Sequence, residues 1–226
     1  DTQAAGGAQG GHMALDASGN VYVAGVTHSA AGIAAGGHDN SYSGAGDAFL
    51  AKFDAAGVRL WATYYGAAGG TFSGGVATDA SGNVYLVGST FSTAGIATAG
   101  AYQTVNSGND VFLVKFNSSG VRQWGTYYGD ASGYIYPGGV RTDPVSGDVY
   151  ITGCTSCTAS IASGGFDNTY KGGGMSGIDA YLVKFSSVGV RQWATYYGGG
   201  TGDDSGNDIG IDAAGNVYLG GLTDSN

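Results

Sequence analysis

The sequence predicts an all-β fold made of tandem repeats, and two observations predict it: the amino-acid composition and a recurring set of motifs. The 226 residues include 46 Gly and 16 Tyr, and all 17 acidic residues are Asp. Residues that favour helices are scarce, whereas Tyr, Val, Thr and Phe suit strands and Gly and Asp suit tight turns. Apolar residues make up 42% of the chain, which is enough for a sizeable core.

Three short motifs recur in the same order along the chain. The first, D-A-S-G-N-V-Y and close variants, begins at positions 63, 64 and 69 residues apart, namely Asp16, Asp79, Asp143 and Asp212. The second, D-x-F/Y-L-x-K-F, begins at Asp47, Asp110 and Asp179. The third, G-V-R-x-W-x-T-Y-Y-G, begins at Gly57, Gly120 and Gly189. Such regular recurrence is the signature of a repeat architecture.

Each repeat divides into four strands, A to D, which in the first copy are expected near 13–16, 21–27, 48–53 and 58–65. Strands B and C carry apolar residues on both faces, so each sheet is expected to lie between two others. A β-propeller provides that environment. We therefore predict one domain, 1–226, with three complete four-stranded blades and an incomplete fourth, at about 11–66, 74–129, 139–198 and 208–226.

The connections between strands differ in length. The A to B turn, D-x-S-G-N, supplies an Asp side chain and a Gly for a tight hairpin. The B to C connection is much longer and spans 28–46 in the first copy. Long loops on a rigid scaffold often carry binding sites, so the rim that holds them is the expected functional face.

The combined motifs, D-x-x-G-N-x-Y-x-x-G-x-T, D-A-F-L-x-K-F and G-V-R-x-W-x-T-Y-Y-G, resemble the SBBP repeat, a bacterial β-propeller repeat. The resemblance covers three full copies and one partial copy. It implies a propeller fold in exported bacterial proteins, often surface proteins, and no shared catalytic residues. The third copy departs from the pattern by one extra residue in its A to B turn and by a Cys pair.

The fourth copy ends after its strand B, which leaves an incomplete blade. An exposed strand edge is a template for pairing with another chain. Two explanations are open: the sequence is a fragment of a larger propeller, or a neighbouring chain completes the blade. The second predicts self-association, including filament formation.

Composition narrows the expected partners and location. The formal net charge is −9 with only eight Lys and Arg, which disfavours nucleic acid as a partner. No apolar run approaches the roughly 18–20 residues that span a bilayer. An extracellular or cell-surface location fits this composition, with a surface glycan or a protein as ligand. Asn117-Ser118-Ser119 also fits an N-glycosylation acceptor.

No motif supports catalysis, and no cofactor is expected. If the chain binds a metal, Ca²⁺ is the chemically sensible ion, and the candidate ligands are Asp203, Asp204 and Asp208. The recurring Asp47, Asp110 and Asp179 are expected to cap turns. The histidines, His12, His28 and His38, have no ligand-like spacing.

Cys154 and Cys157 are the only cysteines, and a local disulfide is the expected pairing. Residues three apart on a regular strand lie roughly 10 Å from each other, whereas a disulfide requires Cα atoms within about 7 Å. The bridge therefore requires the chain to turn between these two positions.

Aromatic residues of the third motif are the expected anchors between blades. They are Trp61, Trp124 and Trp193, with Tyr64, Tyr127 and Tyr196; sugar stacking is the alternative for the tryptophans. The recurring Lys and Arg of strands C and D are expected to form repeated ion pairs or to cover apolar surface.

The sequence thus predicts a non-catalytic extracellular propeller module, structural or adhesive, that self-assembles through its incomplete blade. The alternative is a carbohydrate-binding or Ca²⁺-dependent hydrolytic propeller that uses Asp residues on the long-loop rim. An enzyme would gather acidic or His side chains with perturbed pKa values in a deep pocket. A module would present shallow surfaces rich in Tyr and Gly.

Overall fold

The computed structural model describes residues 12–173, 175 and 177–224, and within these ranges the chain is all-β with no helix. Blade one contains β1 (His12–Leu15), β2 (Val21–Thr27), β3 (Asp47–Phe53) and β4 (Arg59–Tyr65). Blade two contains β5 (Thr71–Thr78), β6 (Val84–Thr90), β7 (Asp110–Phe116) and β8 (Arg122–Tyr128). Blade three contains β9 (Ile135–Thr142), β10 (Val149–Thr155), β11 (Asp179–Phe185) and β12 (Arg191–Tyr197). Blade four has β13 (Asp204–Ile211) and β14 (Val217–Thr223).

Each blade is an antiparallel meander in which strands pair in chain order, so the predicted division into three four-stranded sheets and one two-stranded sheet is confirmed. The strands of type A begin before the predicted blade boundaries, at Thr71, Ile135 and Asp204. In all three a register shift interrupts the pairing with the following strand, for example between Ser73 and Gly75. A β-bulge of this kind bends the strand locally, while the pairing continues on either side of it.

The turns between strands A and B form as the sequence predicts. In blade one, Asp16 accepts backbone hydrogen bonds from Ser18 and Asn20, each at 3.0 Å, through one carboxylate oxygen. Gly19 has φ of 78°, a left-handed conformation that a side chain disfavours. These two requirements explain why Asp and Gly recur at the same places in the turn.

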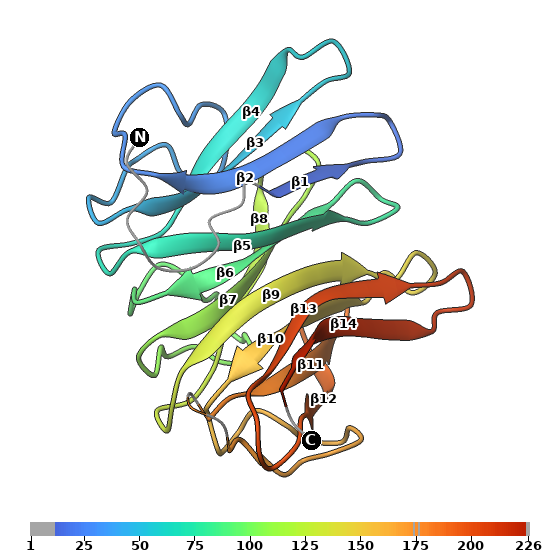
Figure 1. Cartoon of the computed structure of the whole chain (residues 1–226). Helices are drawn as coiled ribbons and strands as arrows, with labels where there is room; N and C mark the ends of the chain where they lie inside the picture. Colours follow the sequence, from blue (N-terminus) through green and yellow to red (C-terminus); the bar gives the residue numbers. More distant parts are fainter. Residues whose placement is uncertain (1–11, 174, 176, 225–226) are drawn as a thin grey trace.

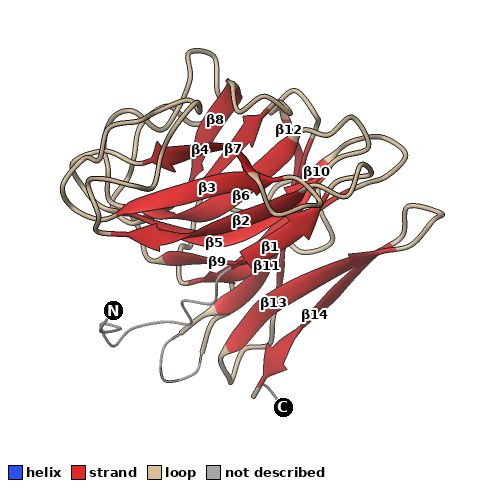
Figure 2. Ribbon diagram, turned by 90° about the horizontal axis from the view of Figure 1, so that it is seen from above, coloured by secondary structure: helices blue, strands red, loops and turns tan. Residues whose placement is uncertain are grey.

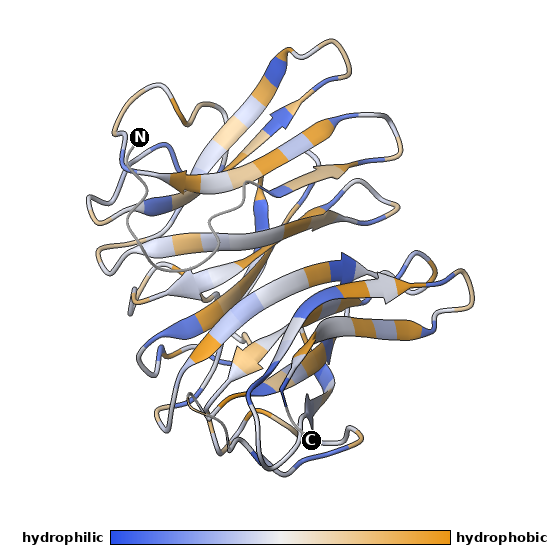
Figure 3. Ribbon diagram, in the orientation of Figure 1, coloured by the Kyte–Doolittle hydropathy of each residue, from blue (hydrophilic) through white to orange (hydrophobic). Residues whose placement is uncertain are grey.

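The hydrophobic core lies between blades and not within them. One buried cluster joins blades one and two and includes Tyr22, Leu50, Tyr65, Leu86, Phe112 and Phe116. A second joins blades two and three and includes Val87, Leu113, Tyr128, Ile151, Tyr181 and Phe185. Between blades three and four the cluster is reduced to Tyr150, Leu182 and Ile209. Figure 3 shows that the strongly hydrophobic stretches follow the strands, whereas the turns are mostly pale or blue. A blade therefore depends on its neighbours to bury both faces.

The blades stack face to face, from blade one at one end to β13 and β14 at the other (Figure 1). The first strands of successive blades lie against each other: β1 contacts β5, β5 contacts β9, and β9 contacts β13. The row is open, since β1 and β13 are not neighbours. In the view from above, β13 and β14 lie at one edge of the molecule, and β14 is the outer strand of this pair (Figure 2).

The long B to C loops cover the outer edges of the complete blades. The loop of blade one pairs with β4 through Ala35 and Ala62, whose backbone groups exchange hydrogen bonds of 2.9 Å. Ser163 and Ala194 make the same contact in blade three, and Thr98 bonds Gly125 in blade two. These loops protect the outermost strand against pairing with another chain. In the described part of the chain, no such loop covers β14.

Candidate functional site

A repeated clamp joins blade one to blade two and blade two to blade three. The indole Nε1 of Trp61 on β4 donates a hydrogen bond of 3.0 Å to the carbonyl oxygen of Ser118, in the turn between β7 and β8. Lys52 Nζ donates to the same oxygen at 3.2 Å. One blade onward, Trp124 and Lys115 bind the carbonyl of Ser187, each at 3.1 Å. A turn in one blade is thus held by two side chains of the preceding blade.

The same lysines are bound within their own blades. Lys52 Nζ lies 3.5 Å from a carboxylate oxygen of Asp16 and 5.0 Å from the ring centre of Tyr22. Lys115 repeats both distances with Asp79 and Tyr85. These cations are buried and combine an ion pair, a cation–π contact and a hydrogen bond.

A glycine in each clamped turn lies against the tryptophan ring. A Cβ atom at Gly120 would come within 2.8 Å of the Trp61 ring, and one at Gly189 within 2.9 Å of Trp124. Gly57 occupies the same turn position in blade one, where no neighbour lies within 4 Å. The ring of one blade therefore packs directly on the backbone of the next.

We expect Gly120→Ala to cost more stability than Gly57→Ala. Both residues have φ of 80°, so both variants incur a conformational cost of about 1–2 kcal/mol. Only Gly120→Ala also overlaps a tryptophan ring, which adds about 1–3 kcal/mol. Chemical denaturation of the two variants measures the difference. Equal losses would contradict the packing of Trp61 on this turn.

The last tyrosine of strand D reaches into the next blade in blades one and two. Tyr65 packs on Phe112 and Phe116, with ring centres 5.2 and 5.7 Å away. Its hydroxyl donates a hydrogen bond of 2.7 Å to the carbonyl of Ile96. Tyr128 packs in the same way on the aromatic residues of β11. Because side chains alternate along a strand, this tyrosine and the tyrosine just before it point to opposite faces of the sheet.

In blade three, the side chains at these positions are not covered, because the described part of the next blade has only two strands. Tyr197, the counterpart of Tyr65 and Tyr128, is 63% exposed, whereas Tyr128 is fully buried. Phe166, in the loop before β11, is 87% exposed. No described residue accepts a hydrogen bond from the Trp193 indole. Tyr197 and Phe166 are thus largely uncovered within the described part of the chain, whereas the Trp193 ring packs on Tyr150 of its own blade, with ring centres 6.0 Å apart.

β14 has no strand paired with its outer edge in the described part of the chain, and its tyrosine is also uncovered. Tyr218 is 59% exposed, although its counterparts Tyr22 and Tyr85 are fully buried beneath a lysine. Its hydroxyl donates a hydrogen bond of 3.0 Å to Asp212. Among the described residues, no basic side chain pairs with Asp212, whereas Asp16 and Asp79 each bind a lysine.

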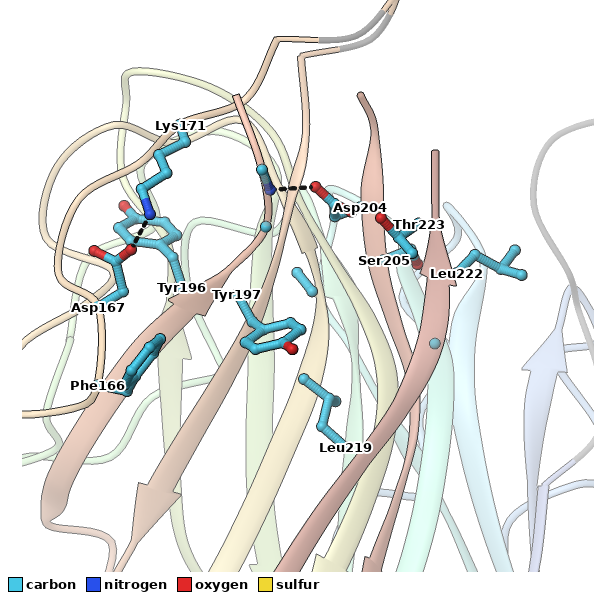
Figure 4. Close-up of a pocket in the computed structure, with 14 residues that line it drawn as sticks. Phe166, Asp167, Lys171, Tyr196, Tyr197, Asp204, Ser205, Leu219, Leu222 and Thr223 are labelled. Carbon is cyan, nitrogen blue, oxygen red and sulfur yellow. Dashed lines mark hydrogen bonds and ion pairs between the residues drawn. The ribbon is translucent and has the colours of Figure 1, made fainter. Parts of the chain in front are cut away.

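A pocket of about 580 Å³ lies between blade three and the two-stranded sheet of β13 and β14. Phe166, Tyr196 and Tyr197 line it from blade three, and Leu219 and Leu222 line it from β14 (Figure 4). Gly221, Asp204 and Ser205 complete the side formed by blade four. Its lining mixes aromatic and aliphatic side chains with polar ones, including Asp167 and Lys171 of blade three, which form an ion pair of 2.6 Å. We take this pocket as the candidate site and call it the open-blade groove.

The predicted anchors occupy different places around the blades. Trp61, Trp124 and Trp193 lie in or against the three inter-blade clusters in turn. Tyr127 and Tyr196 lie in the first and second clusters. Tyr64 is outside the clusters and donates to Ser29 of its own loop at 2.8 Å. Tyr65, Tyr128 and Tyr197 were not among the predicted anchors, although the Y-Y pair in each of the three complete copies was the available signal.

The three candidate Ca²⁺ ligands are not brought together as a metal site. Asp208 forms an ion pair of 2.9 Å with Arg141 on β9. Asp204 accepts a hydrogen bond from the backbone of Gly199 at 2.9 Å, and Asp203 accepts one from Ile178. Within the described ranges, no group of three His, Cys, Asp or Glu side chains could hold a metal ion.

The Asp residues that begin each strand C are buried and cap the preceding loop. Asp47 accepts from the backbone of Ser43, Asp110 from Ser107, and Asp179 from Lys171, at 2.7–2.9 Å. Burial raises the pKa of the Asp110 and Asp179 carboxyls above their ordinary value. They hold the loop at the start of the strand, in agreement with the predicted capping role.

The predicted disulfide is not formed, since both cysteines are free thiols. Cys154 lies on β10, and the strand continues to Thr155, so the chain stays extended where a bridge would need a turn. Cys157 is buried in the second inter-blade cluster. Burial raises the pKa of both thiols.

The three histidines lie in separate parts of blade one. His12 begins β1, and burial lowers its pKa. His38 lies beside Phe116 of blade two, with ring centres 6.1 Å apart. His28 follows β2 and borders Gly46. They are separate features of the framework.

Stacked four-stranded meanders, with first strands side by side and anchors passing from blade to blade, define a β-propeller module. A family model described as SBBP, beta-propeller repeat, matches residues 60–93 and 192–226. Both matches run from a strand D through the A and B strands of the next blade. These two segments of the chain are thus similar to the SBBP β-propeller repeat. A search of curated proteins found no match.

The described residues include no helix that is long and apolar enough to cross a membrane.

Proposed function

We propose that this propeller module is a non-catalytic structural or adhesive part of an extracellular bacterial surface protein, and that it self-associates through its two-stranded blade. The observation that carries the proposal is the open-blade groove. There, an uncovered strand edge on β14 lies next to exposed aromatic side chains of blade three. Exposed edges and apolar patches are typical sites of protein association.

The repeated residues support a structural role. Lys52 and Trp61 and their counterparts in blade two contact the next blade or their own strands. Catalysis on a repeat scaffold usually needs one copy to diverge from the others, and here the copies remain similar. The sparse charge and the abundance of Gly, Tyr and Asp support an extracellular location.

Carbohydrate binding or Ca²⁺-dependent hydrolysis on the long-loop rim receives less support. The loops pack on the outer strands of their own blades, as the contact between Ala35 and Ala62 illustrates. Trp61 is buried, and its indole binds the next blade, so it does not offer a face to a sugar. We therefore retain the association module as the proposed function.

Size-exclusion chromatography with light scattering, over a series of protein concentrations, tests self-association. We expect the wild-type chain to form dimers or larger assemblies as concentration rises, and negative-stain images to show filaments or discrete oligomers. Leu222 on β14 is 72% exposed, and Leu222→Lys should keep the chain monomeric because a charged edge resists pairing.

Val145→Lys is the matched control, because Val145 is similarly exposed, at 79%, but lies in the A to B turn of blade three. It should associate as the wild type does. A wild-type chain that stays monomeric at the highest attainable concentration would contradict the proposal. So would equal association of the two lysine variants.

A further inference from the structure

We propose that the carboxyls of Asp179 and Asp204 hold one proton between them in the folded chain, and that this proton strengthens the junction between blades three and four in acid. The inference goes beyond the proposed function and does not depend on self-association. Asp179 begins β11 and is 1% exposed, and Asp204 begins β13 and is 5% exposed. Two acidic groups buried at one junction make its strength depend on pH.

The two carboxyls meet at Gly198, the residue that follows β12. A Cβ atom at Gly198 would lie 2.6 Å from Asp179 Oδ1 and 2.8 Å from Asp204 Oδ2, so both oxygens border the same small space. The backbone N–H of Asp204 also donates to the carbonyl of Ile178 at 2.9 Å, which ties β13 to the loop that precedes β11. A change of charge at this pair therefore acts on a direct contact between blades.

One oxygen of the pair has no donor. Asp179 Oδ1 is buried and has no hydrogen-bond partner among the described residues. The other oxygen of Asp179 accepts from the backbone N–H of Lys171 at 2.7 Å, and Asp204 Oδ2 accepts from the backbone of Gly199 at 2.9 Å (Figure 4). A buried ionised oxygen without a donor is costly, and a proton on the carboxyl removes that charge.

The surrounding charged groups leave this cost in place. Lys171 lowers the pKa of Asp179, but its Nζ lies 2.6 Å from Asp167 Oδ2 in a half-exposed ion pair. The other titratable side chains around the pair are Asp203, Tyr170 and Tyr196. Burial raises the pKa of both phenols, so they stay neutral. Within the described ranges no third acidic, His or Cys side chain completes a metal site here.

The junctions between the earlier blades lack the second carboxyl. Thr71 begins β5 and Ile135 begins β9, at the position that Asp204 has in β13. The hydroxyls of Thr71 and Thr90 are hydrogen-bonded at 2.9 Å, and the Ile135 side chain lies 3.1 Å from where a Cβ atom of Gly129 would stand. In the described chain, the acidic pair is therefore particular to the junction of blades three and four.

The direction of the pH effect follows from the environment of Asp179. Burial raises its pKa, the backbone N–H of Lys171 lowers it, and the Asp204 carboxylate raises it again, with a net increase. The folded chain thus binds more protons here than the unfolded chain does. The stabilisation is fully present below the unfolded pKa and is lost as pH rises through the folded pKa. His12 and His38 act in the opposite direction, because burial lowers their pKa.

NMR titration of the Asp carboxyl carbons in the full chain tests the proposal directly. We expect one signal of the pair to titrate above the ordinary Asp range, with signals assigned from Asp179→Asn and Asp204→Asn. In Asp204→Asn, the Asp179 signal should titrate at lower pH than in the wild type, because the like charge is gone. Asp208→Asn is the control, since Asp208 is exposed on the same strand and pairs with Arg141. It should leave both signals unchanged.

Urea denaturation at about pH 7 and about pH 5 gives a second measurement, in which comparison of variants cancels the histidines. Asp204→Asn relieves repulsion at the higher pH and removes the protonated pair at the lower pH. Its unfolding equilibrium constant, relative to that of the wild type, should therefore rise about fivefold from the higher to the lower pH. The relative constant of Asp208→Asn should be the same at both.

Three results would overturn the inference. The first is titration of both carboxyls within the ordinary Asp range, a measurement on the wild type that does not require any variant to fold. The second is the same pH dependence in Asp204→Asn and Asp208→Asn. The third is a rise in wild-type melting temperature when Ca²⁺ alone is added at neutral pH, absent in Asp204→Asn, because a cation would then neutralise the pair. Each result leaves the proposed self-association standing.

Discussion

Replacing Tyr128 by Ala should lower the free energy of unfolding by about 3–5 kcal/mol, the usual cost of removing a buried aromatic side chain. Tyr128 is fully buried between blades two and three, with its ring about 6 Å from those of Tyr181 and Phe185. Its hydroxyl donates to the carbonyl of Ile161, and burial raises its pKa, so the phenol stays neutral and keeps this bond. The variant loses both packing and a buried hydrogen bond. Urea denaturation followed by circular dichroism measures the loss.

Tyr197→Ala is the matched control for this prediction. The residue ends β12 as Tyr128 ends β8, but it is exposed at the open-blade groove. Its removal should change the stability of the isolated chain by no more than about 0.5 kcal/mol. Similar losses in the two variants would mean that these tyrosines act within their own blades, against the contacts described here.

We expect Gly88→Ala to be similarly damaging, with a loss of about 3 kcal/mol or more, or failure to fold. Gly88 lies on β6, and a Cβ atom there would overlap the carbonyl oxygen of Phe72 and the ring of Phe112. The backbone of β5 cannot move away without breaking its pairing with β6. Thermal unfolding monitored by calorimetry reports the effect.

Gly200→Ala serves as the comparison, because no neighbour lies within 4 Å of a Cβ atom at that position. Its melting temperature should stay within about 2 °C of the wild type. A tolerated Gly88→Ala would contradict the close approach of strands at this point.

The repeated clamp gives the two faces of a blade different roles. Blades one and two each offer Trp and Lys donors to the blade that follows, and blades two and three each offer a turn carbonyl to the blade that precedes, as Trp61 and Ser118 illustrate. At blade three the donor Trp193 is unsatisfied within the described chain. At blade one, a Cβ atom at the turn glycine Gly57 would meet no described atom within 4 Å.

Much of the architecture could be predicted from local sequence. The strands, their order within each blade and the D-x-S-G-N turns follow from short-range rules, because alternation and turn chemistry involve only neighbouring residues. Asp16 and Gly19 form their predicted turn for this reason. The need for each sheet to lie between two others also followed from strands that are apolar on both faces.

The candidate site could be predicted only in part. The incomplete fourth blade could be predicted from the sequence, and so could its exposed strand edge. The roles of Tyr197 and Trp193 were not, since alternation shows that Tyr196 and Tyr197 point to opposite faces but does not say which face meets the next blade. The structure assigns Tyr65 and Tyr128 to the following blade and, by their counterparts, Tyr197 to the open-blade groove.

What the amino-acid sequence by itself determined was the repeating unit: four strands, their turns and the absence of a self-sufficient core, all set by contacts between residues near one another in the chain. Only the tertiary structure decided which carbonyl each tryptophan binds, how the long loops cover the outer strands and that Cys154 and Cys157 remain unbridged. These features join residues tens of positions apart, and their geometry depends on how one blade is placed against the next.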